Sequence, residues 1–305
     1  MRIISLLPSA TELLVAAGGE RLLVGRSHEC DWPPSITDRP VLTGQRTHAA
    51  TSTEIDAQVS ASLAAGQSLY SLDVERLKAL RPDLILTQDL CEVCSIDLNT
   101  VRMVAGSIDP PPRVLSLDPR TLEDVFDDLL RVGEAAGLQD SARDAMVALR
   151  GRYWEARDHV NAYLDGPEVA FLEWMDPLYV GGHWTPGLIR DAGGRHSLNP
   201  PGVKSRRVTP EELVASSPDR LIVCPCGYDL NAIRRELPAL MRQWWWNDLT
   251  AVRSGHVALV DGNQMFNRPG PRLVDAFEWL VGWLNDRPDV SPPDFPVVDA
   301  IASKC

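Results

Sequence analysis

Two stretches of the chain share one pattern, and this pattern predicts the fold. Residues 75–88 read ERLKALRPDLILTQ, and residues 211–224 read EELVASSPDRLIVC. In each stretch a helical segment ends before a Pro-Asp pair, because proline disfavours the helical conformation in the residue before it. A short apolar run then follows, which is typical of a buried β-strand. The chain therefore carries the same helix-to-strand unit twice.

A second pair of segments supports this repeat. Residues 11–19 (TELLVAAGG) and 186–194 (PGLIRDAGG) both read as helices that end in Gly-Gly, the usual left-handed helix stop. Two chance matches are the alternative, which we disfavour because the order of the segments and their end signals agree. Strands that alternate with helices predict parallel sheets covered by helices.

The expected organisation is two parallel α/β lobes joined by a long bridging helix, with a ligand cleft between the lobes. The N-terminal lobe spans residues 1–120, the bridging helix 121–164, the C-terminal lobe 165–287 and a Pro-rich tail 288–305. Gly133 and Gly137 predict a break in the early part of the bridging segment. Ligands of open α/β sheets bind beyond the carboxyl ends of the strands, so functional residues are expected in the strand-to-helix loops.

The composition excludes several classes of protein. The 305 residues are 44% hydrophobic and 24% charged, which is typical of a soluble globular protein with ample core. The formal net charge of −12 gives a surface that repels phosphate backbones, so no nucleic-acid partner is expected. The sequence holds no apolar run near the ~20 residues that span a bilayer, so no membrane insertion is expected.

The N-terminal residues 1–19, MRIISLLPSATELLVAAGG, superficially resemble a signal peptide. Against this, Pro8 interrupts the apolar run, Glu12 lies within it and only Arg2 supplies a positive charge. We interpret the segment as a buried strand followed by a helix, with Ser9 and Glu12 as an S-x-x-E capping box. A cytoplasmic location is expected for the chain as written, and a periplasmic one if a leader has been removed.

Aromatic side chains gather in one predicted loop of the second lobe. Residues 173–184 read EWMDPLYVGGHW and include Trp174, His183 and Trp184. Such a loop predicts the wall of a site for a large flat ligand, because these rings combine apolar faces with polar edges. The alternative is that the tryptophans fill the core, since tryptophan is highly buried on average.

Five of the six cysteines fall in the expected strand-following loops or at their start. Cys91 and Cys94 form a C-x-x-C motif directly after a predicted strand, and Cys226 follows the corresponding strand of the second lobe. Together with Cys30, in the loop that holds Trp32, they could ligate zinc or an iron–sulfur cluster. The alternatives are buried thiols without a ligand role, and an enzyme that uses Cys91 or Cys94 as nucleophile or redox couple.

The last candidate segment is NRPGPR at residues 267–272, directly before the final predicted helix. We expect Arg268, with Asn267 beside it, to contact an anionic group near the helix N-terminus. A surface turn with a solvated arginine is the alternative. The sequence contains no G-x-S-x-G, P-loop, H-E-x-x-H or G-x-G-x-x-G motif, and no nucleophile with a base and an orienting acid. An enzyme is therefore not expected.

Several of these segments together resemble a known family. Residues 2–14 (RIISLLPSATELL) and 23–27 (LVGRS) resemble the opening of cobalamin-type substrate-binding proteins of ABC transporters. The Pro-Asp strands and the AGG at residues 192–194 fit the wider superfamily of siderophore, haem and metal-binding receptors. LCEVC at 90–94 and FLEW at 171–174 resemble a leaderless branch of the cobalamin-binding group. The resemblance extends to about residue 285.

The resemblance implies two Rossmann-like lobes, joined by one rigid helix, that hold a corrinoid (cobalamin-like) or other metal chelate without enzymatic activity. It implies aromatic contacts from Trp32, Trp174 and Trp184. Pro8 and Ser9, in the loop after the first strand, complete the expected ligand site. An ABC permease is the implied partner if the protein is exported.

Overall fold

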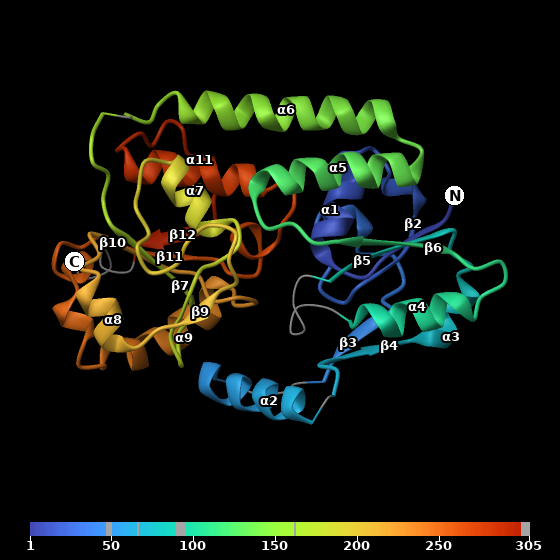
Figure 1. Cartoon of the computed structure of the whole chain (residues 1–305), viewed down its shortest axis with the longest axis horizontal. Coiled ribbons are helices and arrows are strands. Elements are labelled where there is room, and N and C mark those ends of the chain that lie inside the picture. Colours follow the sequence, from blue (N-terminus) through green and yellow to red (C-terminus); the bar gives the residue numbers. More distant parts are fainter. Residues whose placement is uncertain (47–50, 66, 90–95, 162, 300–305) are drawn as a thin grey trace. The chain divides into compact units, whose positions relative to one another are not determined.

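The computed structural model describes residues 1–46, 51–65, 67–89, 96–161 and 163–299, and these residues form two compact units. Unit 1 consists of the described residues within 1–50, 54–119 and 123–150. Unit 2 consists of those within 51–53, 120–122 and 151–305. Each unit is built around its own sheet (Figure 1). The expected α/β class is therefore confirmed.

The elements up to residue 157 belong mainly to unit 1. They are β1 (Ile3–Ser5), α1 (Pro8–Ala16), η1 (Glu20–Leu22), β2 (Leu23–Arg26), η2 (Pro34–Ile36), β3 (Thr43–Gln45), α2 (Ser52–Ala64), β4 (Tyr70–Leu72), α3 (Val74–Ala79), β5 (Leu84–Gln88), α4 (Leu98–Gly106), β6 (Arg113–Leu117), α5 (Leu122–Ala136) and α6 (Gln139–Arg157). Four parallel strands form the main sheet in the order β2-β1-β5-β6. Leu77 of α3 and Val101 of α4 pack with Ile4 and Ile85 on one face of this sheet. Figure 1 shows α1 and α5 on its other face.

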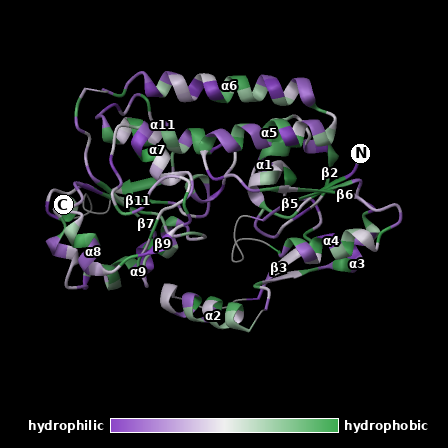
Figure 2. Ribbon diagram, viewed as in Figure 1, coloured by the Kyte–Doolittle hydropathy of each residue, from purple (hydrophilic) through white to green (hydrophobic). Residues whose placement is uncertain are grey.

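The remaining elements form unit 2. They are β7 (Val169–Trp174), β8 (Tyr179–Val180), α7 (Thr185–Asp191), β9 (Arg206–Arg207), α8 (Pro210–Ala215), β10 (Arg220–Val223), α9 (Leu230–Met241), η3 (Trp246–Asp248), α10 (Thr250–Arg253), β11 (Val257–Val260), η4 (Met265–Asn267), α11 (Leu273–Leu284) and β12 (Val297–Asp299). The sheet order is β12-β11-β10-β7-β8-β9. Strands β7, β10 and β11 are parallel and apolar (Figure 2), as expected for strands that helices cover on both faces.

The two Pro-Asp pairs have the same structure in both units. The backbone N–H of Asp83 donates to the carbonyl of Arg2 at 2.8 Å, and its carboxylate accepts from the N–H of Arg2 at 2.6 Å. The backbone N–H of Asp219 donates to the carbonyl of Glu168 at 2.8 Å, and its carboxylate accepts from the N–H of Glu168 at 2.8 Å. Each aspartate thus aligns the start of a central strand with the residue that precedes the first strand of its unit.

The repeated helix ends also share a backbone conformation. Arg81 and Ser217, which precede the two Pro-Asp pairs, have positive φ angles of 44° and 45°. In the Gly-Gly pairs, Gly18 and Gly193 have φ angles of 83° and 89°. A left-handed residue ends a helix and turns the chain toward the next strand. The internal repeat predicted from the sequence is therefore present in the backbone.

The bridging segment, expected over residues 121–164 as a long helix with a break near Gly133 and Gly137, forms two helices, α5 and α6. The chain turns between them at Gly137, whose φ angle is 71°. Gly133 stays inside α5, where a Cβ atom would lie 2.2 Å from the Cβ of Ala142 on α6. Glycine at position 133 therefore allows α5 and α6 to approach closely. The break between the two helices lies at Gly137.

The first helix begins two residues earlier than the capping box predicts. Pro8 is its first residue, Leu7 is the N-cap, and no side chain caps the helix. Proline is favoured at this position because its fixed φ suits a helix and its missing N–H would have no intrahelical partner. Ser9 is consequently buried inside the first turn, and the predicted Ser9–Glu12 capping box is wrong.

Replacing Asp219 by alanine should lower the free energy of unfolding by about 1 kcal/mol, because one hydrogen bond from a backbone N–H to a carboxylate is lost. Asp83→Ala should act in the same direction in unit 1. Urea titration of each variant measures the change, with Asp165→Ala as the control because Asp165 lies exposed in a loop. Equal stability of all three variants would show that the Pro-Asp carboxylates do not hold the strands.

Asp128 on α5 is a buried carboxyl group in an unfavourable environment. Its side chain is 4% exposed, and Oδ1 accepts from Arg131 at 2.5 Å. Its other oxygen, Oδ2, is buried and has no hydrogen-bond partner among the described residues. Burial, only partly offset by Arg131, raises the pKa of Asp128 from 3.8 to about 6.

Because the folded-state pKa of Asp128 exceeds the unfolded value, this group stabilises the protein at low pH and loses that effect as the pH rises from about 4 to about 6. Asp128→Asn removes this titration. The free energy of unfolding of the variant, relative to the parent, should therefore increase by on the order of 2 kcal/mol between pH 4 and pH 7.5. Urea titrations across this range measure it, and a pH-independent difference would contradict the assignment.

Candidate functional site

The carboxyl ends of the parallel strands are where an open α/β sheet binds its ligands. In unit 1 these are the ends of β1, β2 and β5. Pro8 and Ser9 follow β1, and Ser9 is only 3% exposed. Trp32, in the loop after β2, is 46% exposed. Cys91 and Cys94, in the loop after β5, lie outside the described residues.

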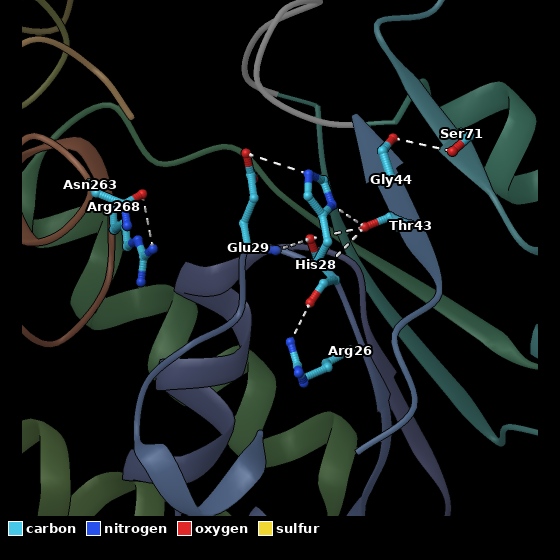
Figure 3. Close-up of polar contacts among 9 residues, drawn as sticks. Arg26, His28, Glu29, Thr43, Gly44, Ser71, Asn263 and Arg268 are labelled. Atoms are coloured by element: carbon cyan, nitrogen blue, oxygen red, sulfur yellow. Dashed lines mark hydrogen bonds and ion pairs between the residues drawn. The ribbon is translucent and has the colours of Figure 1, made fainter. Parts of the chain in front are cut away.

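The loop after β2 is held by one arginine that the sequence did not single out. The guanidinium of Arg26 donates to the backbone carbonyls of Ser27 at 3.2 Å, Cys30 at 2.9 Å and Thr37 at 2.9 Å. Three carbonyls of one loop thus share a single cation, and Figure 3 shows the first of these bonds. Such a side chain restricts the loop before any ligand arrives.

Cys30 is buried within unit 1. It has no exposed surface, and its Sγ lies 3.1 Å from Oγ1 of Thr11 on α1. Cys226, the other expected metal ligand within the described residues, is exposed in unit 2. No group of three or more His, Cys, Asp or Glu side chains that could hold a metal ion occurs among the described residues. The four-thiolate site stays a prediction, because two of its members lie outside them.

His28 and Thr43 form a polar cluster at the end of β2 (Figure 3). The Nδ1 atom of His28 lies 2.7 Å from Oγ1 of Thr43, which also accepts from the backbone N–H of His28 at 3.0 Å. Thr43 in turn donates to Oγ of Ser27 at 3.1 Å. Burial lowers the pKa of His28, so its ring is neutral near pH 7. Sequence reasoning missed this cluster, because Thr43 comes from β3.

An aromatic pair lies at the end of β7 in unit 2. Trp174 is the last residue of β7, and Tyr228 follows β10, the strand beside β7. Their rings meet edge to face, with centroids 5.3 Å apart. Tyr228 donates its hydroxyl hydrogen to Glu236 at 2.8 Å, and the indole N–H of Trp174 donates to the carbonyl of Ser52 at 3.3 Å. Both polar edges are thus satisfied within unit 2.

Glu236, which accepts the hydroxyl hydrogen of Tyr228, is also hydrogen-bonded to Ser52. The carboxylate of Glu236 accepts from the backbone N–H of Ser52 at 2.9 Å and from its hydroxyl at 2.6 Å. Burial and the neighbouring Glu236 raise the pKa of Tyr228 well above its usual value. The phenol therefore stays protonated and keeps donating to Glu236.

The remaining expected aromatics have different surroundings. Trp184 is 7% exposed, and its indole N–H donates to the carbonyl of Phe266 at 2.7 Å. His183 stacks on it with ring centroids 5.5 Å apart, and has a positive φ of 51°. Trp184 therefore packs in the core of unit 2 and supports the half-buried His183 ring.

Asn267 and Arg268 lie in the segment between β11 and α11. The side-chain amide of Asn267 donates to the carbonyls of Cys224 at 3.2 Å and Gly262 at 2.9 Å, so it ties together the loops after β10 and β11. Arg268 is 7% exposed and contacts Oδ1 of Asn263 at 3.5 Å (Figure 3). Both residues therefore lie at the carboxyl edge of the unit 2 sheet. Cys224 is fully buried, as expected for a core thiol.

The sequence pattern of the periplasmic binding protein family matches residues 3–263. The chain belongs to this family. The chain is 25% identical to the vitamin B12-binding protein of Photorhabdus laumondii over 289 residues, which cover 94% of this chain and 88% of that protein. It is 22% identical to the vitamin B12-binding protein of Vibrio cholerae, over 93% of this chain and 88% of the relative.

Solved structures have the same fold as this periplasmic binding protein. The vitamin B12-binding protein BtuF of Vibrio cholerae matches with a TM-score of 0.68 and 20% identity, over 94% of this chain and 97% of that chain. A periplasmic heme-binding protein from Pseudomonas aeruginosa matches with a TM-score of 0.71 and 23% identity, over 93% and 92%. At these identities the likeness establishes the two-lobed fold alone.

Family membership also decides the general kind of activity. Periplasmic binding proteins are substrate-binding proteins of ABC transporters and not enzymes, so the expectation of a non-enzymatic binding protein is confirmed. Within the described part of the chain, no helix is long and apolar enough to cross a membrane.

Replacing Arg26 by glutamine should loosen the loop at residues 27–37 while the unit 1 sheet persists. Loss of the hydrogen bonds to three carbonyls should reduce the local opening free energy by roughly 1–3 kcal/mol. Hydrogen–deuterium exchange of peptides from this loop measures the effect. Arg21→Gln is the matched control, because Arg21 is an exposed arginine one turn before β2. Unchanged exchange in Arg26→Gln would show that the loop does not depend on this guanidinium.

Proposed function

We propose that this periplasmic binding protein binds a planar metal chelate of the corrinoid type. The observation that carries the proposal is the aromatic pair of Trp174 and Tyr228 at the carboxyl end of β7 and β10. Their polar edges are already hydrogen-bonded within the protein. What the half-buried Trp174 offers a ligand is therefore an apolar face, which suits a large flat macrocycle.

The relatives support a corrinoid as the first candidate. The proteins of Photorhabdus laumondii and Vibrio cholerae are named for vitamin B12, and the similarity extends over nearly the whole chain. We expect Trp32, Trp174 and the His183 ring to contact the macrocycle, and Arg268 to meet an anionic group of the ligand. An ABC permease is the expected partner, because the family serves such transporters.

Heme is the second candidate, since it is also a planar metal macrocycle. The observation that favours it is the imidazole of His28, which Thr43 holds at the carboxyl end of β2, because imidazole is a common ligand of heme iron. A heme-binding protein shares the fold, although at 23% identity that likeness carries no information on the ligand.

Equilibrium dialysis against cyanocobalamin tests the proposed function. Trp174→Ala should weaken binding by about 5- to 30-fold, because an aromatic face that contributes 1–2 kcal/mol is lost. Trp32→Ala tests the second predicted contact separately. Trp154→Ala is the control, because Trp154 is 52% exposed on α6 and belongs to no strand-following loop.

Hemin is titrated in parallel by its absorption band. Saturable binding of cyanocobalamin by the parent protein and the control, weakened in Trp174→Ala, is the expected result. Saturable binding of hemin alone would select the second candidate. Binding of neither macrocycle at 100-fold molar excess would refute the proposed function.

A further inference from the structure

Four residues of unit 2 form a closed ring of contacts that includes the proposed aromatic pair. The indole N–H of Trp174 donates to the carbonyl of Ser52 at 3.3 Å. The backbone N–H and the hydroxyl of Ser52 donate to the carboxylate of Glu236 at 2.9 and 2.6 Å. Tyr228 donates its hydroxyl hydrogen to the same carboxylate at 2.8 Å, and its ring meets the Trp174 ring edge to face. Both routes that leave Trp174 therefore end at Glu236.

Glu236 supplies the acidic group of this ring of contacts. A carboxylate only accepts hydrogen bonds, so all three donors must point towards it. Hydrogen bonds to a charged acceptor are shorter and stronger than those between neutral groups. The distances of 2.9 and 2.6 Å from Ser52 and 2.8 Å from Tyr228 agree with this. Glu236 therefore sets the orientation of the Tyr228 hydroxyl and of the Ser52 backbone together.

Ser52 is fixed by two carboxylates of unit 2. It is the first residue of α2 and is 2% exposed, and its backbone N–H donates to Glu236 on α9. A negative charge is stabilised at a helix N-terminus, so α9 supplies a cap for the first turn of α2. The next residue, Thr53, donates its hydroxyl hydrogen to Asp176 at 2.6 Å. The Ser52 carbonyl is thus held in place as the acceptor of the Trp174 indole.

The orientation of the Trp174 ring depends on these contacts. Trp174 is the last residue of β7 and is only half-buried, so core packing leaves part of the ring uncovered. A side chain in such a position has several staggered rotamers open to it. The hydrogen bond to Ser52 and the contact with Tyr228 select one of them. A ring held in one rotamer before the ligand arrives loses less conformational entropy on binding.

We propose that Glu236 is the positioning residue of the ligand site, and that it holds the Trp174 ring, through Ser52 and Tyr228, in the orientation that stacks on the chelate. This inference rests on the proposed function and adds the residue that prepares the site. Glu236 makes no contact with the ligand itself, because its carboxylate is occupied by its three donors.

Affinity for cyanocobalamin, measured by equilibrium dialysis, is the first test. Glu236→Ala should weaken binding about 2- to 12-fold, because the Trp174 side chain must then be ordered when the ligand binds. Glu236→Gln should bind more tightly than Glu236→Ala, because its amide oxygen still accepts from Ser52. Glu211→Ala is the matched control, since Glu211 is an exposed glutamate in the first turn of α8 in the same unit. Thermal unfolding shows that each variant is folded.

A double-mutant cycle with Trp174→Ala separates positioning from a general structural role. If Glu236 acts through Trp174, Glu236→Ala should weaken binding in the parent but leave the affinity of the Trp174→Ala variant unchanged. Equal weakening in both backgrounds would show that Glu236 acts on the site by another route, and would overturn the proposal.

A second measurement needs no ligand. The indole N–H groups give separate signals in a proton–nitrogen correlation NMR spectrum, and Trp174→Phe identifies the signal of Trp174 among those of the nine tryptophans. Glu236→Ala should shift this signal and speed its exchange with solvent, because the Ser52 carbonyl is no longer fixed. The signal of Trp184, whose indole donates to the carbonyl of Phe266, should not move.

The two measurements distinguish this proposal from the proposed function. A shifted Trp174 signal, together with weakened binding that disappears in the Trp174→Ala background, supports positioning by Glu236. An unchanged Trp174 signal or an unchanged cyanocobalamin affinity in Glu236→Ala overturns the proposal while the proposed function stands. If the parent binds neither cyanocobalamin nor hemin, both proposals fail, and a shifted Trp174 signal would then assign Glu236 a purely structural role.

Discussion

In both units a single aspartate carboxylate holds the start of a central strand to the residue that precedes the first strand. Asp83 binds the backbone of Arg2, and Asp219 binds the backbone of Glu168. This contact fixes which strands are neighbours and where they begin, so it also fixes the edge at which they end. Because all these strands are parallel, the loops that follow them emerge at one edge of each sheet. The position of every candidate site residue in the strand-following loops depends on this alignment.

The loops at that edge are held by side chains that donate to backbone carbonyls. Arg26 does so for the loop after β2, and Asn267 does so for the loops after β10 and β11. Both residues act on carbonyl groups that lie outside the sheet ladders. A binding protein gains from this arrangement, because loops that are ordered in advance lose less conformational entropy when the ligand binds. In both units a side-chain donor holds the strand-following loops through their backbone carbonyls, an arginine in unit 1 and an asparagine in unit 2.

The sequence predicted the features that depend on local chain chemistry. The Pro-Asp strands, the left-handed helix ends and the turn near Gly137 follow from proline and glycine, whose backbone preferences do not depend on distant residues. The predicted capping box is absent because of a proline preference as well. Pro8 is the first residue of the helix, so Ser9 lies inside the first turn and cannot be the N-cap. The sequence left open whether Trp184 lines a site or fills the core, because its burial depends on a distant partner, the carbonyl of Phe266. The pairing of His28 with Thr43 was equally inaccessible, because it requires β3 to lie beside the loop after β2.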